Sequence, residues 1–197
     1  MSNPNKNPIT DQQLVAAVLR GYRQAFGSII KSTEGLVAQM TFKMVNSPGD
    51  RKDIAQDVYL KVFKNLPGFQ FKSKLSTWVG QITYNTCLNY LEKRKLVLVD
   101  EFDEDGGSSD IRMETVPQDG TETLLSAKEL AGILQAEIDG LKPLYKTLIS
   151  LYHQEELSYA EIAEITSLPE GTVKNYIFRA RKILKENILQ TYKRSDL

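Results

Sequence analysis

An acidic strip in the middle of the chain limits how this sequence can fold. Residues 100–126 contain nine Asp and Glu residues and one Arg, together with Gly, Ser and Pro and few apolar side chains. Such a composition cannot bury enough apolar surface to offset the conformational entropy lost on folding, so the strip is predicted to be a linker. The rest of the 197-residue chain must therefore fold as two small domains, one on each side of it.

Charge is distributed unevenly along the chain, although the formal net charge is zero. Residues 1–99 carry 14 basic and 6 acidic side chains, whereas residues 127–197 carry ten of each. The acidic linker can act as a solvated spacer. Alternatively, it can occupy a basic nucleic-acid channel, because a run of carboxylates resembles a phosphate chain in charge.

Few side chains are suited to metal binding or catalysis. The single cysteine, Cys87, excludes an internal disulfide framework and fits a reducing compartment. With His153 as the only histidine, expected at the surface or at a helix end, no structural zinc site can form from thiolates and imidazoles. Without a phosphate-binding glycine loop, we expect no enzyme and no cofactor. No apolar run approaches a membrane span of about 20 residues and no secretory segment is found, so a cytoplasmic protein is expected.

The amino-terminal half shows no strand alternation and is predicted to be helical. Thr10 and Gln13 form a capping box that opens the first helix, and Asp50 is predicted to cap the third. Pro67 and Gly68 should end that third helix. The expected helices cover residues 10–19, 22–45, 50–66 and 75–95.

The third predicted helix has one apolar and one polar face. Its apolar residues recur every fourth position and should face inward: Ile54, Val58, Val62 and Leu66. The polar side chains are left for the exposed side: Asp53, Gln56, Asp57, Lys61 and Lys64.

A basic and aromatic segment, FQFKSK at residues 69–74, precedes the fourth helix. Interleaved rings and cations suit single-stranded DNA, because bases stack on rings while cations follow the backbone. For Trp78 the competing interpretation, burial in the core, is favoured, and Phe69 and Phe71 are expected to anchor the loop. The stronger candidates for DNA contact are the polar groups Lys72, Ser73, Lys74 and Asn85.

Residues 157–184 are predicted to form a helix-turn-helix. Ser158 and Glu161 form a capping box for the first helix, and Pro169 places the start of the second helix close to Glu170. Such a pair can lay one helix across a DNA backbone and insert the next into the major groove.

The second helix of this pair is amphipathic. Its apolar face should pack in the core and comprises Val173, Ile177, Ala180, Leu184 and Ile188. The opposite face carries donors suited to phosphates and base edges, namely Lys174, Asn175, Arg179, Lys182 and Lys185, together with Phe178. An ordinary solvated helix surface is the alternative, but the preceding helix and turn favour DNA contact.

Two segments of the chain resemble conserved regions of bacterial sigma factors. The segment from Asp50 to Lys95, with its D-x-x-Q-D run at residues 53–57 and S-T-W at residues 76–78, resembles the second region. The segment 157–184, with G-T-V-K and F-R-A-R, resembles the fourth. A short chain with these two regions and no domain between them is similar to the extracytoplasmic-function group. The resemblance implies an all-α protein with region 2 at residues 8–96, an acidic linker at 97–125 and region 4 at 126–192.

The resemblance also implies a role for each site. The chain would bind core RNA polymerase and direct promoter-specific initiation, with the linker threading toward the RNA exit path. Asp53, Gln56, Asp57 and Lys61 would contact the clamp of the largest polymerase subunit. Lys72, Ser73, Lys74 and Asn85 would capture a flipped base of the minus-10 element, and Lys174, Asn175, Phe178, Arg179 and Lys182 would read the minus-35 element.

Two positions depart from the family pattern. Tyr176 stands where relatives often have Arg or Lys, and helical projection puts it at the edge of the core. Ser167 stands where a glycine is common because a positive φ is easiest for glycine, and serine can be accommodated there if the turn is slightly different. A free-standing helix-turn-helix regulator remains the alternative function. Many relatives are held by an anti-sigma factor, but this sequence does not identify one.

Overall fold

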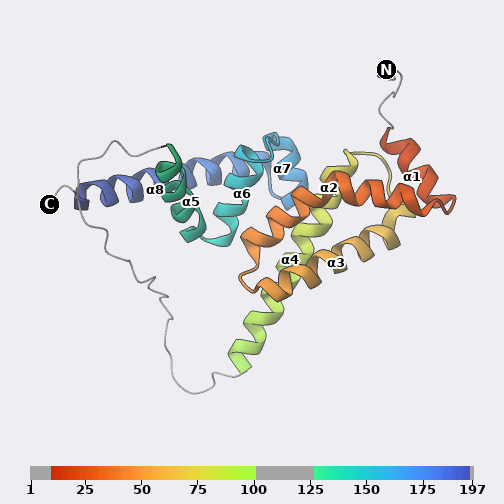
Figure 1. Cartoon of the computed structure of the whole chain (residues 1–197), viewed down its shortest axis with the longest axis horizontal. Coiled ribbons are helices and arrows are strands. Elements are labelled where there is room, and N and C mark those ends of the chain that lie inside the picture. Colours follow the sequence, from red (N-terminus) through yellow and green to blue (C-terminus); the bar gives the residue numbers. More distant parts are fainter. Residues whose placement is uncertain (1–9, 101–126, 196–197) are drawn as a thin grey trace.

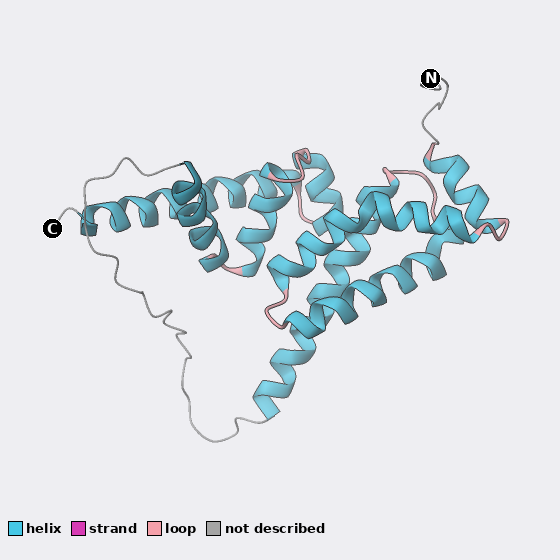
Figure 2. Cartoon of the chain, viewed as in Figure 1, coloured by secondary structure: helices cyan, strands magenta, loops and turns pink. Residues whose placement is uncertain are grey.

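The computed structural model describes residues 10–100 and 127–195 of the chain. This described part consists of helices, turns and loops and contains no strand (Figure 2), as expected for an all-α protein. The predicted linker lies outside the described residues except for 97–100, which continue the fourth long helix. The elements are α1 (Asp11–Leu19), α2 (Arg23–Met44), α3 (Pro48–Asn65), the 3-10 turn η1 (Leu66–Gly68), α4 (Leu75–Asp100), α5 (Ala127–Gly140), α6 (Pro143–His153), α7 (Tyr159–Thr166) and α8 (Glu170–Ser195).

Side-chain caps fix the starts of the first and third helices. The capping box of α1 is confirmed: the Gln13 amide donates to Thr10 Oγ1 at 3.2 Å, and the Thr10 amide donates to Gln13 Oε1 at 3.0 Å. The predicted cap of α3 was wrong, because the helix begins at Pro48 and Ser47 is its N-cap. Proline suits the first helical position, where its missing N–H leaves no bond unmade. Asp50 lies in the first turn instead and accepts a hydrogen bond from Tyr90 at 2.6 Å.

Helices α1 to α4 pack together as the amino-terminal domain (Figure 1). The inward face predicted for α3 is confirmed, since Val58 and Val62 are fully buried and Ile54 and Leu66 nearly so. In the loop that leads into α4, Phe69 is buried and its ring lies 4.9 Å from that of half-buried Trp78. Phe69 thus anchors the loop, as predicted. Phe71 contacts the Phe69 ring at 4.7 Å but stays 41% exposed.

Helices α5 to α8 form the carboxy-terminal domain, with α7 and α8 as the helix-turn-helix. The capping box of Ser158 and Glu161 is present, and α8 begins at Glu170, as predicted. Ser167 itself adopts the left-handed conformation, with φ 56° and ψ 27°. No different turn is needed, because serine itself occupies the positive-φ position at a modest steric cost.

The core face of α8 forms largely as its periodicity predicts. Val173, Ile177, Ala180 and Leu184 are buried, whereas Ile188 is only partly covered.

The two domains are in direct contact. α7 packs against α4, and α6 packs against α2 (Figure 1). Segments far apart in the sequence therefore share buried surface, and the helix-turn-helix lies beside the helix that follows the basic, aromatic loop.

Candidate nucleic-acid and polymerase interfaces

The exposed face of α8 is basic and available. All six side chains predicted for this face are exposed, and Phe178 retains 67% of its accessible surface. Lys174 and Lys182 pair along the helix with Glu170 at 2.7 Å and Glu186 at 3.8 Å, contacts that solvent screens and a phosphate can replace. Within the described residues, no ion pair or hydrogen bond engages Arg179. Its guanidinium is therefore free to bind a base edge or a phosphate.

Tyr176 is a packing residue at the edge of this face. It is half-buried and meets the Tyr145 ring edge-on at 5.8 Å. This agrees with the helical projection, which placed it at the edge of the core. The side chain therefore packs α8 against α6 and adds no cation to the basic face of α8.

A cluster of aromatic rings and a cation joins α6 to the two helices of the helix-turn-helix. Tyr152 stacks on Tyr159 at 4.7 Å, and the Arg181 guanidinium lies over the Tyr152 ring at 5.1 Å. Arg181 Nε also lies 3.2 Å from His153 Nε2. Burial lowers the pKa of His153, and the charge of Arg181 lowers it further. The histidine is exposed at the end of α6, where the sequence placed it.

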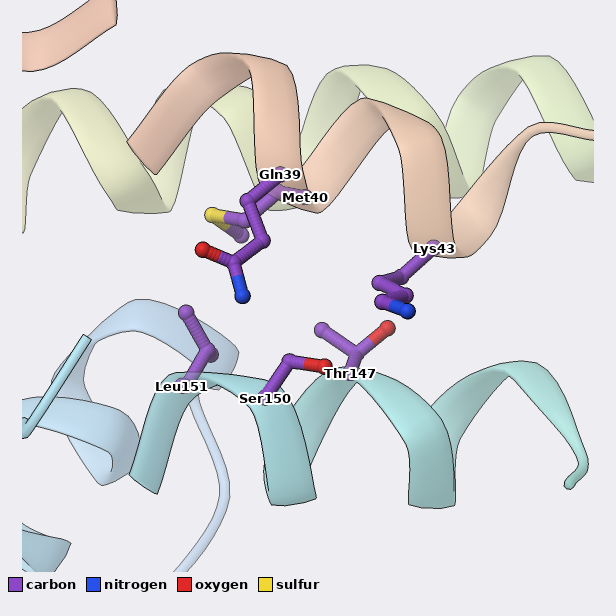
Figure 3. Close-up of a pocket in the computed structure, with 6 residues that line it drawn as sticks. All are labelled: Gln39, Met40, Lys43, Thr147, Ser150 and Leu151. Carbon is purple, nitrogen blue, oxygen red and sulfur yellow. The ribbon is translucent and has the colours of Figure 1, made fainter. Parts of the chain in front are cut away.

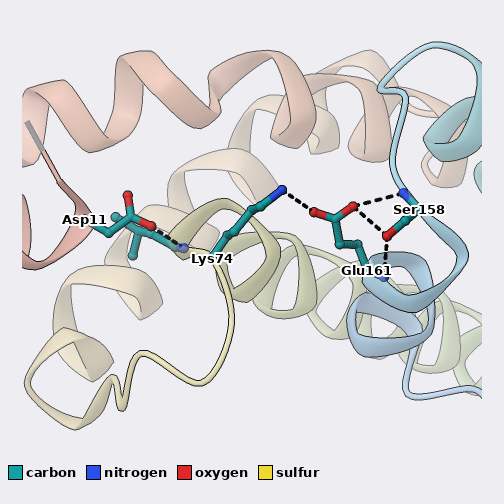
Figure 4. Close-up of polar contacts among 5 residues, drawn as sticks. Asp11, Lys74, Ser158 and Glu161 are labelled. Carbon is teal, nitrogen blue, oxygen red and sulfur yellow. Dashed lines mark hydrogen bonds and ion pairs between the residues drawn. The ribbon is translucent and has the colours of Figure 1, made fainter. Parts of the chain in front are cut away.

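The polar residues predicted to bind the minus-10 element occupy the end of the loop and one face of α4. Lys72 and Asn85 are exposed and Ser73 is partly so. The loop is fixed by a hydrogen bond from the Leu75 amide to Asp11 Oδ2 at 2.9 Å (Figure 4). Lys74 differs from the others, because its ammonium binds Glu161 of α7 at 2.7 Å.

Glu161 joins the helix cap of α7 to the amino-terminal domain. Its carboxylate accepts from Lys74 Nζ and from both the amide and the hydroxyl of Ser158 (Figure 4). The hydrogen bond from Lys74 and those from Ser158 lower the pKa of Glu161 from 4.5 to about 2. The same contact raises the pKa of Lys74. One carboxylate thus serves both a local cap and an interdomain ion pair.

The exposed face of α3 presents the residues predicted to contact polymerase. Asp53, Gln56 and Asp57 are exposed. Lys61 is half-buried, because its ammonium pairs with Asp57 at 2.8 Å and donates to Thr86 of α4 at 3.2 Å. It therefore also ties α3 to α4.

Two apolar side chains on this face were missed by the sequence analysis. Leu60 is 69% exposed and Phe63 is 57% exposed. Both lie seven residues after a polar member of the face, Leu60 after Asp53 and Phe63 after Gln56, so helical spacing alone could have found them. Large exposed apolar groups between charged ones are typical of a protein-binding surface.

The contact between α2 and α6 is closely packed (Figure 3). Gln39 hydrogen-bonds Gln154, and Lys43, whose side chain is only 5% exposed, pairs with Asp139 of α5 at 2.7 Å. Burial raises the pKa of Asp139, but the hydrogen bond from Lys43 and that from Gln135 outweigh it, so the pKa is lowered overall. The ion pair is thus maintained across the interface at neutral pH.

A separate apolar groove of about 680 Å³ lies within the carboxy-terminal domain. It is formed by α5, α6 and α8, and Ile188, predicted to face the core, is part of its wall. The main apolar walls of the groove are Leu134, Ile138, Ile149, Leu184 and Ile188, and the basic side chains Arg181 and Lys185 also line it.

The buried cysteine and the described acidic groups provide no reactive or metal centre. Cys87 is fully buried, which raises the pKa of its thiol to about 12. Among the described residues, no three His, Cys, Asp or Glu side chains gather as metal ligands. No described helix is long and apolar enough to cross a membrane.

Fold and site together define a class: a two-domain helical protein with a helix-turn-helix in its second domain. Family profiles agree with that division, since "Sigma-70 region 2" matches residues 29–97 and "Sigma-70, region 4" matches residues 131–184. The chain is 34% identical to the ECF RNA polymerase sigma-E factor of Haemophilus influenzae, over 91% of this chain and 96% of that protein. It is 30% identical to the Escherichia coli (strain K12) protein of the same name, over 91% and 95%.

A more distant relative is the ECF sigma factor SigW of Bacillus subtilis, at 28% identity over 88% of this chain and 94% of that protein. Two solved structures share the fold: CnrH in complex with the cytosolic domain of CnrY, and the sigma factor RpoE of Bartonella quintana in complex with the anti-sigma factor NepR. Their TM-scores are 0.60 and 0.61 at 20% identity, with 90% and 82% of this chain and 96% and 94% of those chains covered. The chain belongs to the ECF sigma factors of RNA polymerase.

The acid titration of Glu161 tests the ion pair between Lys74 and Glu161. Because the folded pKa lies below the ordinary value, the carboxylate contributes stability above about pH 4.5 that is lost as the pH falls toward 2. We expect nuclear magnetic resonance to show Glu161 titrating near pH 2. Lys74→Ala should raise that pKa, because it removes the largest cause of the shift. Titration near 4.5 in the native chain would contradict the contact.

Proposed function

We propose that this chain is a promoter-specificity subunit that binds core RNA polymerase and directs initiation by reading the minus-35 and minus-10 elements. The observation that carries the proposal is that one family member exposes a basic helix face on α8 of its second domain and a separate face of polar and apolar side chains on α3 of its first. Under this proposal the polymerase catalyses RNA synthesis, and this chain supplies promoter recognition and opening of the DNA strands. Both act in the cytoplasm. Anti-sigma factors, like the NepR protein bound to the B. quintana relative, are a further class of partner.

The docking face on α3 is suited to a helical partner. This face repeats at steps of three and four residues, the spacing with which one helix packs along another. Its members at these steps are Asp53, Gln56, Leu60 and Phe63. Leu60 provides an apolar centre, and the charged side chains provide a polar rim. These features support assigning Asp53, Gln56, Asp57 and Lys61 to the polymerase clamp, with Leu60 added.

Replacing the apolar centre of this face should weaken polymerase binding without harming the fold. Leu60→Ala removes a side chain that is 69% exposed, so the free energy of unfolding should change by less than about 0.5 kcal/mol. Affinity for core polymerase should fall about tenfold if Leu60 is a central contact. Leu130→Ala, at a position 48% exposed on α5, is the matched control. Equal affinity of both variants in a pull-down titration would count against the assignment.

Under this proposal, the minus-35 element is read by five residues of α8: Lys174, Asn175, Phe178, Arg179 and Lys182. Reversing charge with Arg179→Glu should cost about 1–3 kcal/mol if Arg179 contacts a base, and mainly lower the salt dependence if it contacts phosphate. Lys182→Glu is expected to weaken binding similarly. Lys142→Glu, at an exposed lysine just before α6 in the same domain, controls for net charge alone. Unchanged transcription and salt slope in both test variants would refute the role.

The minus-10 element is contacted, under this proposal, by Lys72, Ser73, Lys74 and Asn85. Extruding a base costs a few kcal/mol of stacking, which a polar pocket and nearby cations can offset. Asn85→Ala and Lys72→Ala should therefore reduce permanganate reactivity of the melted strand while leaving polymerase affinity unchanged. Asn46→Ala, at another exposed asparagine, is the control. Full reactivity with Asn85→Ala would argue against base capture at this site.

A free-standing helix-turn-helix regulator, the alternative function, would use α8 in the same way but would have no need of the α3 face, and membership of the ECF sigma factors counts against it. Co-purification with core polymerase, followed by transcription from a mapped promoter, separates the two functions. Site-specific duplex binding by the chain alone, with no affinity for polymerase, would favour the regulator.

A further inference from the structure

Phe71, in the loop between η1 and α4, combines a left-handed backbone with an exposed aromatic ring. Its φ is 54°, and its side chain retains 41% of its accessible surface. Glycine adopts such a φ freely, whereas a Cβ atom crowds the backbone there, and for a bulky side chain the conformation is a genuine outlier. Strain of this kind collects at binding sites, where the surrounding structure holds it in place. The loop therefore keeps a strained phenylalanine whose ring is partly open to solvent.

Neighbouring contacts fix the position of this ring. The Phe71 ring lies 4.7 Å from the Phe69 ring, which in turn lies 4.9 Å from the ring of Trp78 on α4. Phe69 is buried and Trp78 half-buried, so Phe71 is the exposed end of a series of three rings. The loop is also held at its far end, where the Leu75 amide donates to Asp11 Oδ2 at 2.9 Å. A ring that is already positioned loses little conformational freedom when a ligand stacks on it.

The charged groups beside the ring favour an anionic ligand. Residues 69–74 include two lysines and no acidic side chain. Lys74 is paired with Glu161, whereas Lys72, the immediate neighbour of Phe71, is exposed and forms no ion pair within the described residues. Proteins hold single-stranded nucleic acid with such an arrangement, because the base stacks on the ring and the phosphate binds the cation. A nucleotide therefore matches this surface better than an apolar peptide does.

An amide side chain lies along the same face of α4 as the ring series. Asn85 follows Trp78 by seven residues, or two turns of helix, so the two positions share a face about 10 Å apart. The Asn85 side chain is exposed, and its amide can both donate to and accept from the edge of a base. The Phe71 ring can therefore bind the face of a base, and Asn85 can bind the edge of one.

We infer that Phe71 is a stacking residue of the minus-10 site, with its exposed ring against an unpaired base of the melted strand and Lys72 on the adjoining phosphate. The inference rests on the proposed function and deepens it, because the residues assigned there bind only through polar groups. It gives the two phenylalanines of the loop different roles: Phe69 anchors the loop and Phe71 contacts the base. It also accounts for the strained φ, because glycine at this position would provide no ring.

Substitutions at position 71 separate the ring from the backbone. In holoenzyme reconstituted with core polymerase, Phe71→Ala and Phe71→Gly should each lower the equilibrium constant for opening a mapped promoter about fivefold or more. Phe71→Tyr, which keeps the ring, should open it as the native chain does. Phe42→Ala, at a phenylalanine 50% exposed on α2, is the matched control and should also behave as native.

Two results of these measurements would overturn the inference. Native opening by Phe71→Gly would mean that only the left-handed backbone matters, because glycine adopts that conformation without the ring. Weaker binding of core polymerase by Phe71→Ala would instead make Phe71 a docking residue for the polymerase. We expect the affinity for core polymerase to be the same for all of these variants.

Abasic templates identify the base that stacks on Phe71. On a fork template with an unpaired non-template strand, each base of the minus-10 element is removed in turn and the affinity of the holoenzyme is measured. At one position the effects of base removal and of Phe71→Ala should not add, because both remove the same stacking contact. Additive losses at every position, as a merely structural role predicts, would overturn the inference. If the native chain opens no promoter, the proposed function fails and the inference with it; if Phe71→Ala opens the promoter as well as the native chain does, the inference alone fails.

Discussion

Burial of apolar side chains around α4 is the interaction on which the rest of the structure depends. α4 packs against α2 and α3 within its own domain and against α7 of the other. Its fully buried residues include Val79 and Cys87, and Gly80 between them allows α7 to approach the backbone. One helix therefore supports the loop of the proposed minus-10 site, the face that carries Asn85 and the closed arrangement of the two domains.

The proposed DNA-binding and polymerase-binding surfaces share a physical design. In each, a helix buries one apolar face and leaves polar groups in fixed positions on the other. On α8 the buried residues hold Asn175 and Arg179 outward, and on α3 Val58 and Val62 hold Gln56 and Leu60 outward. Rigid helices position such groups more accurately than loops do, which suits contacts that must form in register with DNA or with a partner helix.

Charge has a different role at the contact between the domains. Lys74 pairs with Glu161 at 2.7 Å, and Asp139 pairs with Lys43 at 2.7 Å and is further stabilised by the charge of Lys146.

The sequence by itself determined the helices, their caps and their buried faces, because helical periodicity and capping are local properties of the chain. The inward residues of α3 and α8, the capping box at Ser158 and the peripheral place of Tyr176 follow directly from spacing. Local reasoning erred at Asp50, where two candidate caps compete, and it left open whether Ser167 itself takes the positive φ of the turn. Only the tertiary structure revealed that Lys74 pairs with Glu161 and that Gly80 receives Ile165. Those contacts join residues more than 80 positions apart, and no pattern within either segment specifies how two separately folded surfaces meet.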